Sequence, residues 1–81
     1  MQIKILLFAQ LKDIVGSSEV VLEVKNGCTG KQLIDKLIND YPDITPLKES
    51  LMLSMDDDYI TVEDIIKEGS EIAALTPVSG G

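Results

Sequence analysis

The sequence predicts an α+β fold, a mixed sheet of about five strands with one main helix packed on it and an extended C-terminal tail. Three observations predict this arrangement. Two strand-like stretches precede the only long helical pattern, further short strand-like stretches follow it, and 81 residues leave room for a single core. Because two strands come before the helix, the simplest solution is one sheet with the helix across one face.

The first strand is predicted over residues 2–9. Ile3, Ile5 and Leu7 alternate there with Leu6 and Phe8, so both faces of the strand are apolar. Apolar residues on both faces are typical of a strand that is buried on both sides. We therefore expect a central strand with little exposed surface.

Residues 11–15 predict a short helical turn that ends at Gly16. The second strand follows at residues 19–24, where Val20 and Leu22 alternate with Glu19 and Glu23. An alternation with period two predicts a strand with one face toward the core.

The one long helix is predicted over residues 29–40. Thr29 is followed three residues later by Gln32, which is the spacing of a capping box. Apolar residues then recur at helical spacing until Pro42 stops the pattern. These residues are Leu33, Ile34, Leu37, Ile38 and Tyr41. Residues 44–50 are ambiguous, and a helical turn that begins at Pro46 is one interpretation of them.

The remaining elements are short. Residues 51–55 and 59–61 predict two strands around a solvated Asp56-Asp57-Asp58 turn, residues 62–67 a turn closed by Gly69, and residues 71–75 the last strand. This order is the layout of the β-grasp, or ubiquitin-like, fold. We expect a β-grasp domain over residues 1–75 and a flexible tail over residues 76–81.

Composition excludes several classes of function. The net charge of -7 disfavours binding to nucleic acid and to anionic membranes, so we expect neither partner. The sequence shows neither an export signal nor a membrane span, which predicts a soluble, cytoplasmic protein. The absence of histidine removes imidazole bases, Ser-His or Cys-His nucleophile pairs and His-containing metal sites.

Two features invite other chemistry. Cys28 precedes the predicted helix, where a helix dipole lowers a thiol pKa, but without a partner base we favour a small, half-buried apolar role. The acidic turn at residues 56–58 lacks the spacing of a calcium loop, because the sixth position is Thr61 rather than glycine. We therefore expect no metal site.

The chain ends with the residues TPVSGG. Pro77 fixes its own φ and favours an extended Thr76, so the tail leaves the last strand straight and can reach roughly 20 Å. Glycine loses more backbone freedom on ordering than other residues, so the advantage of Gly80 and Gly81 must be steric. Without Cβ atoms they can pass a narrow channel and present an unhindered carboxylate. The tail thus predicts a carboxylate that is activated by another protein.

Four segments support a family resemblance: Phe8-Ala9-Gln10, the short helix with its closing Gly16, residues 69–73, and the Pro77-Val78-Ser79-Gly80-Gly81 ending. With these segments the chain resembles, over its whole length, the small sulfur-carrying subunits of molybdopterin synthase. It departs from the family pattern at Thr76, where a first proline is usual, and at Asp56, where Asn is common.

The resemblance implies a carrier cycle. A partner like a ubiquitin-activating enzyme, acting as adenylyltransferase and sulfurtransferase, would use ATP and magnesium to adenylate Gly81 and convert it to a thiocarboxylate. The sulfur would pass to cyclic pyranopterin monophosphate on a large subunit, in a heterotetramer of two large and two small subunits. The large subunit would supply the acid-base residues, so this chain would be a non-catalytic sulfur donor without a permanently bound cofactor.

Docking on such a partner needs apolar anchors beside the tail. Tyr59, Leu75 and Phe8 match contact positions of the family, although Leu75 and Phe8 could equally be core residues. Along the tail, the expected contacts are Pro77, Val78, Ser79 and Gly80. Three other functions stay open: a sulfur carrier for thiamine or tRNA thiolation, a modifier that is joined to lysine amines, and an interaction domain with an idle tail.

Overall fold

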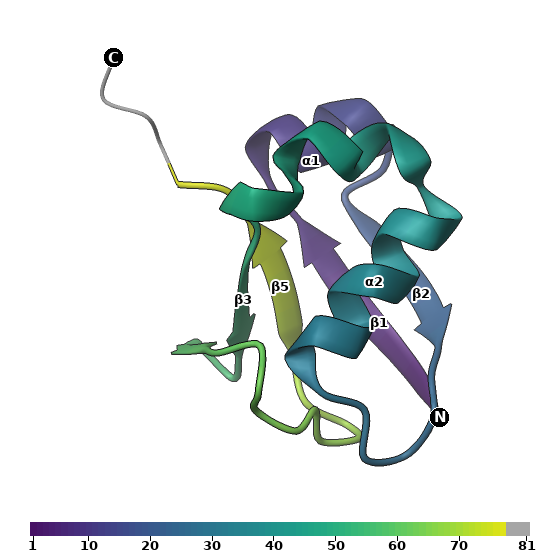
Figure 1. Ribbon diagram of the computed structural model, residues 1–81, viewed down its shortest axis with the longest axis vertical. Coiled ribbons are helices and arrows are strands. Elements are labelled where there is room, and N and C mark those ends of the chain that lie inside the picture. The colour runs from purple at the N-terminus through teal and green to yellow at the C-terminus, as the bar shows by residue number, and fades with distance from the viewer. Residues whose placement is uncertain (78–81) are drawn as a thin grey trace.

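The computed structural model describes residues 1–77 and shows one mixed, five-stranded sheet (Figure 1). Helix α2 lies across one face of this sheet, and the helices α1 and η1 lie toward the end at which β5 finishes (Figure 1). The elements in chain order are β1 (Gln2–Leu7), α1 (Ala9–Val15), β2 (Glu19–Glu23), α2 (Gly30–Asp40), the 3₁₀ helix η1 (Pro42–Ser50), β3 (Met52–Met55), β4 (Asp58–Ile60) and β5 (Ile72–Leu75).

The strand order across the sheet is β2-β1-β5-β3-β4. Strand β1 pairs with β5 in parallel, with Ile5 opposite Ile72, and every other pairing is antiparallel. The parallel pair lies inside the sheet, where neighbours protect both of its edges. The α+β prediction, the mixed sheet and the single long helix across it are confirmed.

The core lies between the sheet and the helices. Alternate residues of the strands point into it, and α1, α2 and η1 add Leu11, Leu37 and Ile44, each fully buried. Within residues 1–77, the helices form one layer, so they cover one face of the sheet. The largest fully buried side chains are Ile3, Ile5, Leu7, Leu11, Leu22, Leu33, Leu37, Ile44, Ile66 and Ile72.

The expectation that the first strand is buried on both sides is wrong. Leu6 is only half-buried, and Phe8 is 48% exposed. The strand also ends at Leu7, because Phe8 is already the N-cap of α1. The physical reason is that the described helices all pack on the face that holds Ile3, Ile5 and Leu7. The apolar residues of the other face therefore need a different explanation.

The start and the end of α2 agree with the sequence. Thr29 and Gln32 form the predicted capping box: the Gln32 amide donates to Thr29 Oγ1 at 3.3 Å, and the Thr29 amide donates to Gln32 Oε1 at 2.9 Å. The ambiguous segment after α2 is the 3₁₀ helix η1, which begins at Pro42 rather than Pro46. Proline suits the first turn of a helix, where its missing N–H has no partner to lose.

The connection between β3 and β4 is a turn, as predicted, and its two central residues are Asp56 and Asp57. Both have positive φ, 53° and 73°, which is the geometry of a type I′ hairpin. Asp58 belongs to β4 rather than to the turn. None of the helices in residues 1–77 is long and apolar enough to cross a membrane.

Candidate functional site

The second face of the sheet, which we call the open face, carries a mostly apolar row of residues across four strands. Leu6 of β1 lies beside Ala73 of β5, Ala73 beside Ser54 of β3, and Ser54 beside Tyr59 of β4. Paired residues of neighbouring strands point to the same side of a sheet. Tyr59 is 67% exposed, so the row ends in an aromatic side chain that stands in solvent.

A second row lies next to the first, at the end of β5. Leu75 pairs with Met52, and both are half-buried. Phe8 follows the buried Leu7 with an extended backbone, so the alternation of β1 turns its side chain to the open face. Phe8, Tyr59 and Leu75, which the sequence singles out from separate segments, therefore share one face.

The tail begins at this face. Thr76 and Pro77 directly follow Leu75, and Pro77 is exposed. Val78, Ser79, Gly80 and Gly81 lie outside the described residues. The geometry thus provides an apolar surface whose last strand continues directly into the tail. The roles of these residues as partner contacts stay predictions.

Sequence reasoning missed two members of the open face. Met52 was not singled out, although its alternation with Leu53 in a short strand could have identified it. Leu6 was assigned to a buried second face, because an apolar residue on a docking surface has the same pattern as one in a core. Only the position of the helix layer distinguishes the two interpretations.

Ion pairs of the described residues lie on strands β1 and β2 and on helix α2. Lys4 and Glu19 form an exposed ion pair across β1 and β2 at 3.5 Å. Elsewhere, on α2, the hydrogen bond from the Lys31 ammonium lowers the pKa of Asp35. Within residues 1–77, no cluster of three or more Cys, Asp or Glu side chains is arranged to hold a metal ion.

Cys28 has the structural role that the sequence favours. Its side chain is 4% exposed, and its Sγ donates to the Thr29 carbonyl at 3.3 Å. Burial raises the pKa of the Cys28 thiol, which opposes any activation by the helix that follows. Cys28 is therefore a small core residue whose thiol is shielded from solvent.

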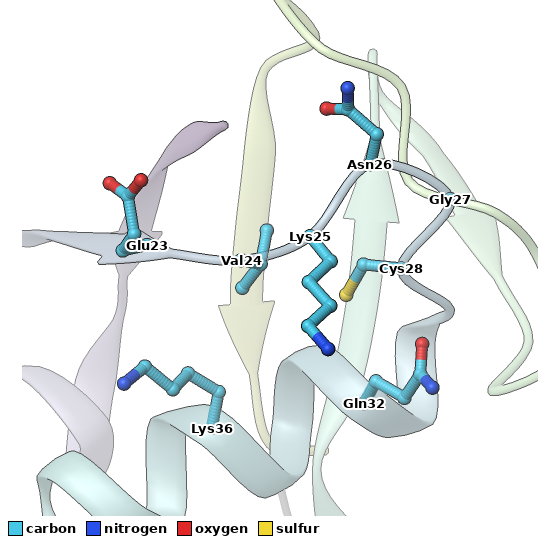
Figure 2. Close-up of a pocket in the computed structure, with 8 residues that line it drawn as sticks. All are labelled: Glu23, Val24, Lys25, Asn26, Gly27, Cys28, Gln32 and Lys36. Carbon is cyan, nitrogen blue, oxygen red and sulfur yellow. The ribbon is translucent and has the colours of Figure 1, made fainter.

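Cys28 also lines a hollow of about 380 Å³ between the β2–α2 loop and α2 (Figure 2). Lys25 and Cys28 of the loop point toward α2, which contributes Gln32 and Lys36 (Figure 2). Glu23, at the edge of this hollow, pairs with Gln2 at the start of β1. The hollow therefore lies at the opposite end of the sheet from the start of the tail.

Comparisons with known proteins agree with this description. The sequence matches the ThiS family over residues 5–81. The molybdopterin synthase sulfur carrier subunit of Dictyostelium discoideum is 39% identical over 83 residues, which cover 99% of this chain and 96% of the relative.

Two solved structures share the β-grasp fold. SAMP1 from Haloferax volcanii has a TM-score of 0.86 at 22% identity, and the match covers 100% of both chains. A chain from the complex of subunits 1 and 2 of the molybdopterin-converting factor of Helicobacter pylori has a TM-score of 0.69 at 18% identity, again over 100% of both chains. At these identities the likeness shows the fold alone. The family match covers residues 5–81, and the Dictyostelium relative is 39% identical over nearly the whole chain. On that basis the chain belongs to the ThiS family.

Proposed function

We propose that this chain is the sulfur-carrier subunit of a molybdopterin synthase and that the Gly81 carboxylate carries the sulfur. The observation that carries the proposal is the continuity of the apolar open face, through Leu75, with the tail that leads to Gly80-Gly81. The family match extends to residue 81, and the relative at 39% identity is itself a molybdopterin synthase sulfur carrier subunit.

The chemistry starts from a poor electrophile, because a free carboxylate resists nucleophilic attack. An adenylating partner uses ATP and magnesium to join the Gly81 carboxylate to AMP and releases pyrophosphate. A persulfide sulfur then displaces AMP from the acyl carbon. This step forms a new C–S bond and gives an acyl disulfide. A second thiol of the donor then attacks the inner sulfur and cleaves the S–S bond that came from the persulfide, which leaves a disulfide on the donor and a thiocarboxylate on Gly81.

The loaded carrier then docks on the large subunit. The open face packs against that partner, and the tail places the thiocarboxylate next to cyclic pyranopterin monophosphate. Sulfur transfer and hydrolysis return the Gly81 carboxylate, and two transfers complete the dithiolene. The large subunit supplies the acid-base groups, and the assembly contains two large and two small subunits in the cytoplasm. The carrier holds no cofactor of its own.

Intact-mass measurement of the protein from its native cells tests this proposal. We expect a species heavier than the free acid by the mass difference between sulfur and oxygen, and a thiol-selective alkylating agent should modify it at Gly81. The chain without Gly81 is the matched control: it should fold and dock but support no molybdopterin formation. Normal molybdopterin formation by this shortened chain would contradict the proposal.

The same measurements separate the other functions. A modifier of lysine amines would appear as higher-mass, amide-linked adducts. A carrier for thiamine or tRNA thiolation would show the same thiocarboxylate but would bind other partners than the large subunit. An idle tail would give the free acid alone, with or without the adenylating partner.

A further inference from the structure

Strand β4 carries Tyr59, the most exposed aromatic side chain of the protein, but the strand itself is short and lies at the edge of the sheet. It is three residues long, it lies at the edge of the sheet, and it pairs with β3 alone. So short an edge strand contributes little stability of its own. Tyr59, at 67% exposure, has no core packing that could fix it from the side-chain end. Ile60 of β4 packs against the core, but Tyr59 does not, so the position of Tyr59 depends on the backbone of β4 and on how its two ends are held.

Asp56 holds the first end. Its amide donates to the Glu71 carbonyl at 2.9 Å, and the Glu71 amide donates back to Asp56 Oδ1 at 3.0 Å. In an ordinary antiparallel pair the second bond would go to the backbone carbonyl. The positive φ of Asp56 turns the chain into the hairpin at this point, and the side-chain carboxylate takes that place. The turn is thereby tied to the residue that precedes β5.

Asp64 holds the second end. The amide of Thr61, the residue after β4, donates to Asp64 Oδ2 at 2.7 Å, and Thr61 Oγ1 donates to the same oxygen at 3.3 Å. The surrounding loop is fastened to α2, since the amides of Gly30 and Lys31 donate to the carbonyls of Asp64 and Val62, both at 2.9 Å. The end of β4 is thus linked through one carboxylate to the start of the main helix.

We propose that Asp56 and Asp64 are positioning residues for partner docking, which they serve by holding β4 so that Tyr59 stands in place on the open face. This inference rests on the proposed function, because it assumes that the open face contacts the large subunit. A contact side chain that is already ordered loses less entropy on binding. Hydrogen bonds that hold β4 in place should therefore raise the affinity for the large subunit. This inference also gives a role to Asp56, which belongs to the acidic turn at residues 56–58, where the spacing does not match a calcium loop.

The first test replaces Asp56 with Gly and, as the matched control, with Asn. Glycine adopts positive φ readily but has no acceptor for the Glu71 amide, whereas Asn tolerates the same φ and keeps Oδ1. We expect D56G to bind the purified large subunit about 3- to 10-fold more weakly in calorimetry, the loss that one hydrogen bond is worth. D56N should bind like the unchanged protein. Equal affinity of D56G and the unchanged protein would overturn the role of Asp56.

Asp64 is tested in the same way with D64A and D64N. The alanine variant removes the acceptor of the Thr61 amide, and the asparagine variant retains an oxygen at that position. We expect D64A to lose affinity and D64N to keep most of it.

Amide hydrogen exchange should be faster at residues 58–60 in D56G and D64A, while the amides of β1 and α2 keep their protection. Uniformly faster exchange would instead indicate general destabilisation and overturn the inference.

A double-mutant cycle shows whether the carboxylates act through Tyr59. We expect Tyr59→Ala to weaken docking about 5-fold or more, as anchors of an interface do. In the D56G background the same substitution should cost less, because Tyr59 is already poorly held. If the fold-losses of affinity of the two single variants simply multiply in the double variant, the two residues act independently, which would overturn the positioning role. If Tyr59→Ala and Leu75→Asp both leave docking unchanged, the proposed use of the open face itself has failed.

Discussion

At the scale of single residues, Gly30 shows a requirement that sequence patterns did not reveal. A Cβ atom built on Gly30 would lie 2.8 Å from the Thr61 carbonyl oxygen and 3.2 Å from Val62 Cα. These are backbone atoms, which cannot rotate away. The first turn of α2 therefore approaches the loop after β4 more closely than any side chain permits. Nothing in the local sequence demands glycine there, because the constraint comes from a segment thirty residues away.

We expect Gly30→Ala to lower the free energy of unfolding by about 1–3 kcal/mol, since the loop must move to admit the methyl group. Urea denaturation measures the change. Lys31→Ala is the neighbouring control, because Lys31 is exposed and its ion pair with Asp35 is a surface pair of small worth. The explanation would be wrong if both variants were equally stable.

The buried thiol gives a pH-dependent prediction. Burial raises the pKa of Cys28, so its stabilising contribution is complete below the ordinary pKa of an unfolded thiol. This contribution should be lost as the pH rises through the higher folded pKa. Denaturation curves in this alkaline range should show the loss, and the part due to Cys28 should be absent in Cys28→Ala. A native thiol that iodoacetamide alkylates as fast as the unfolded one would contradict the burial.

At the scale of elements, local signals predicted α2 and most strands. The Thr29–Gln32 capping box and the alternation of β2 rest on neighbouring residues, so they can be read from the chain. The 3₁₀ helix η1 has no such periodicity, and its start at Pro42 could not be separated from the end of α2. The error on β1 arose from packing: no local pattern tells which face of a strand a distant helix will cover.

Helix α2 is the element on which the fold depends most, because it covers the sheet. Leu37 is fully buried beneath it, and Leu37→Ala should cost about 2–5 kcal/mol, a large share of the stability of so small a domain. The exposed Asn39 of the same helix is the control, since Asn39→Ala removes no core contact. Chemical denaturation of both variants tests the assignment, and similar midpoints would refute it.

At the scale of the whole molecule, the candidate site combines positions that are distant in sequence. The sequence predicted Phe8, Tyr59, Leu75 and the tail as separate candidates, and it could not show that three of them share the open face. That relation depends on the strand order β2-β1-β5-β3-β4, which places the last strand in the middle of the sheet.

Leu75→Asp tests the open face as a docking surface. A carboxylate on this face should lose water on docking without gaining a partner, so we expect clearly weaker binding to the large subunit in calorimetry. Ile14→Asp is the matched control, because Ile14 is 38% exposed but lies on α1, outside the open face. The circular dichroism spectra should remain unchanged in both. Equal binding of the two variants would refute the assignment.

The single-sided helix layer also bears on how such a domain can diverge. Along β1 and β2, one set of alternate residues builds the core and the other set lies on the open face. Substitutions in the second set leave the buried contacts intact, so they change stability little. A duplicated copy of this domain could therefore acquire a new partner within the same strands, while the residues that fold it stay under separate and undiminished selection.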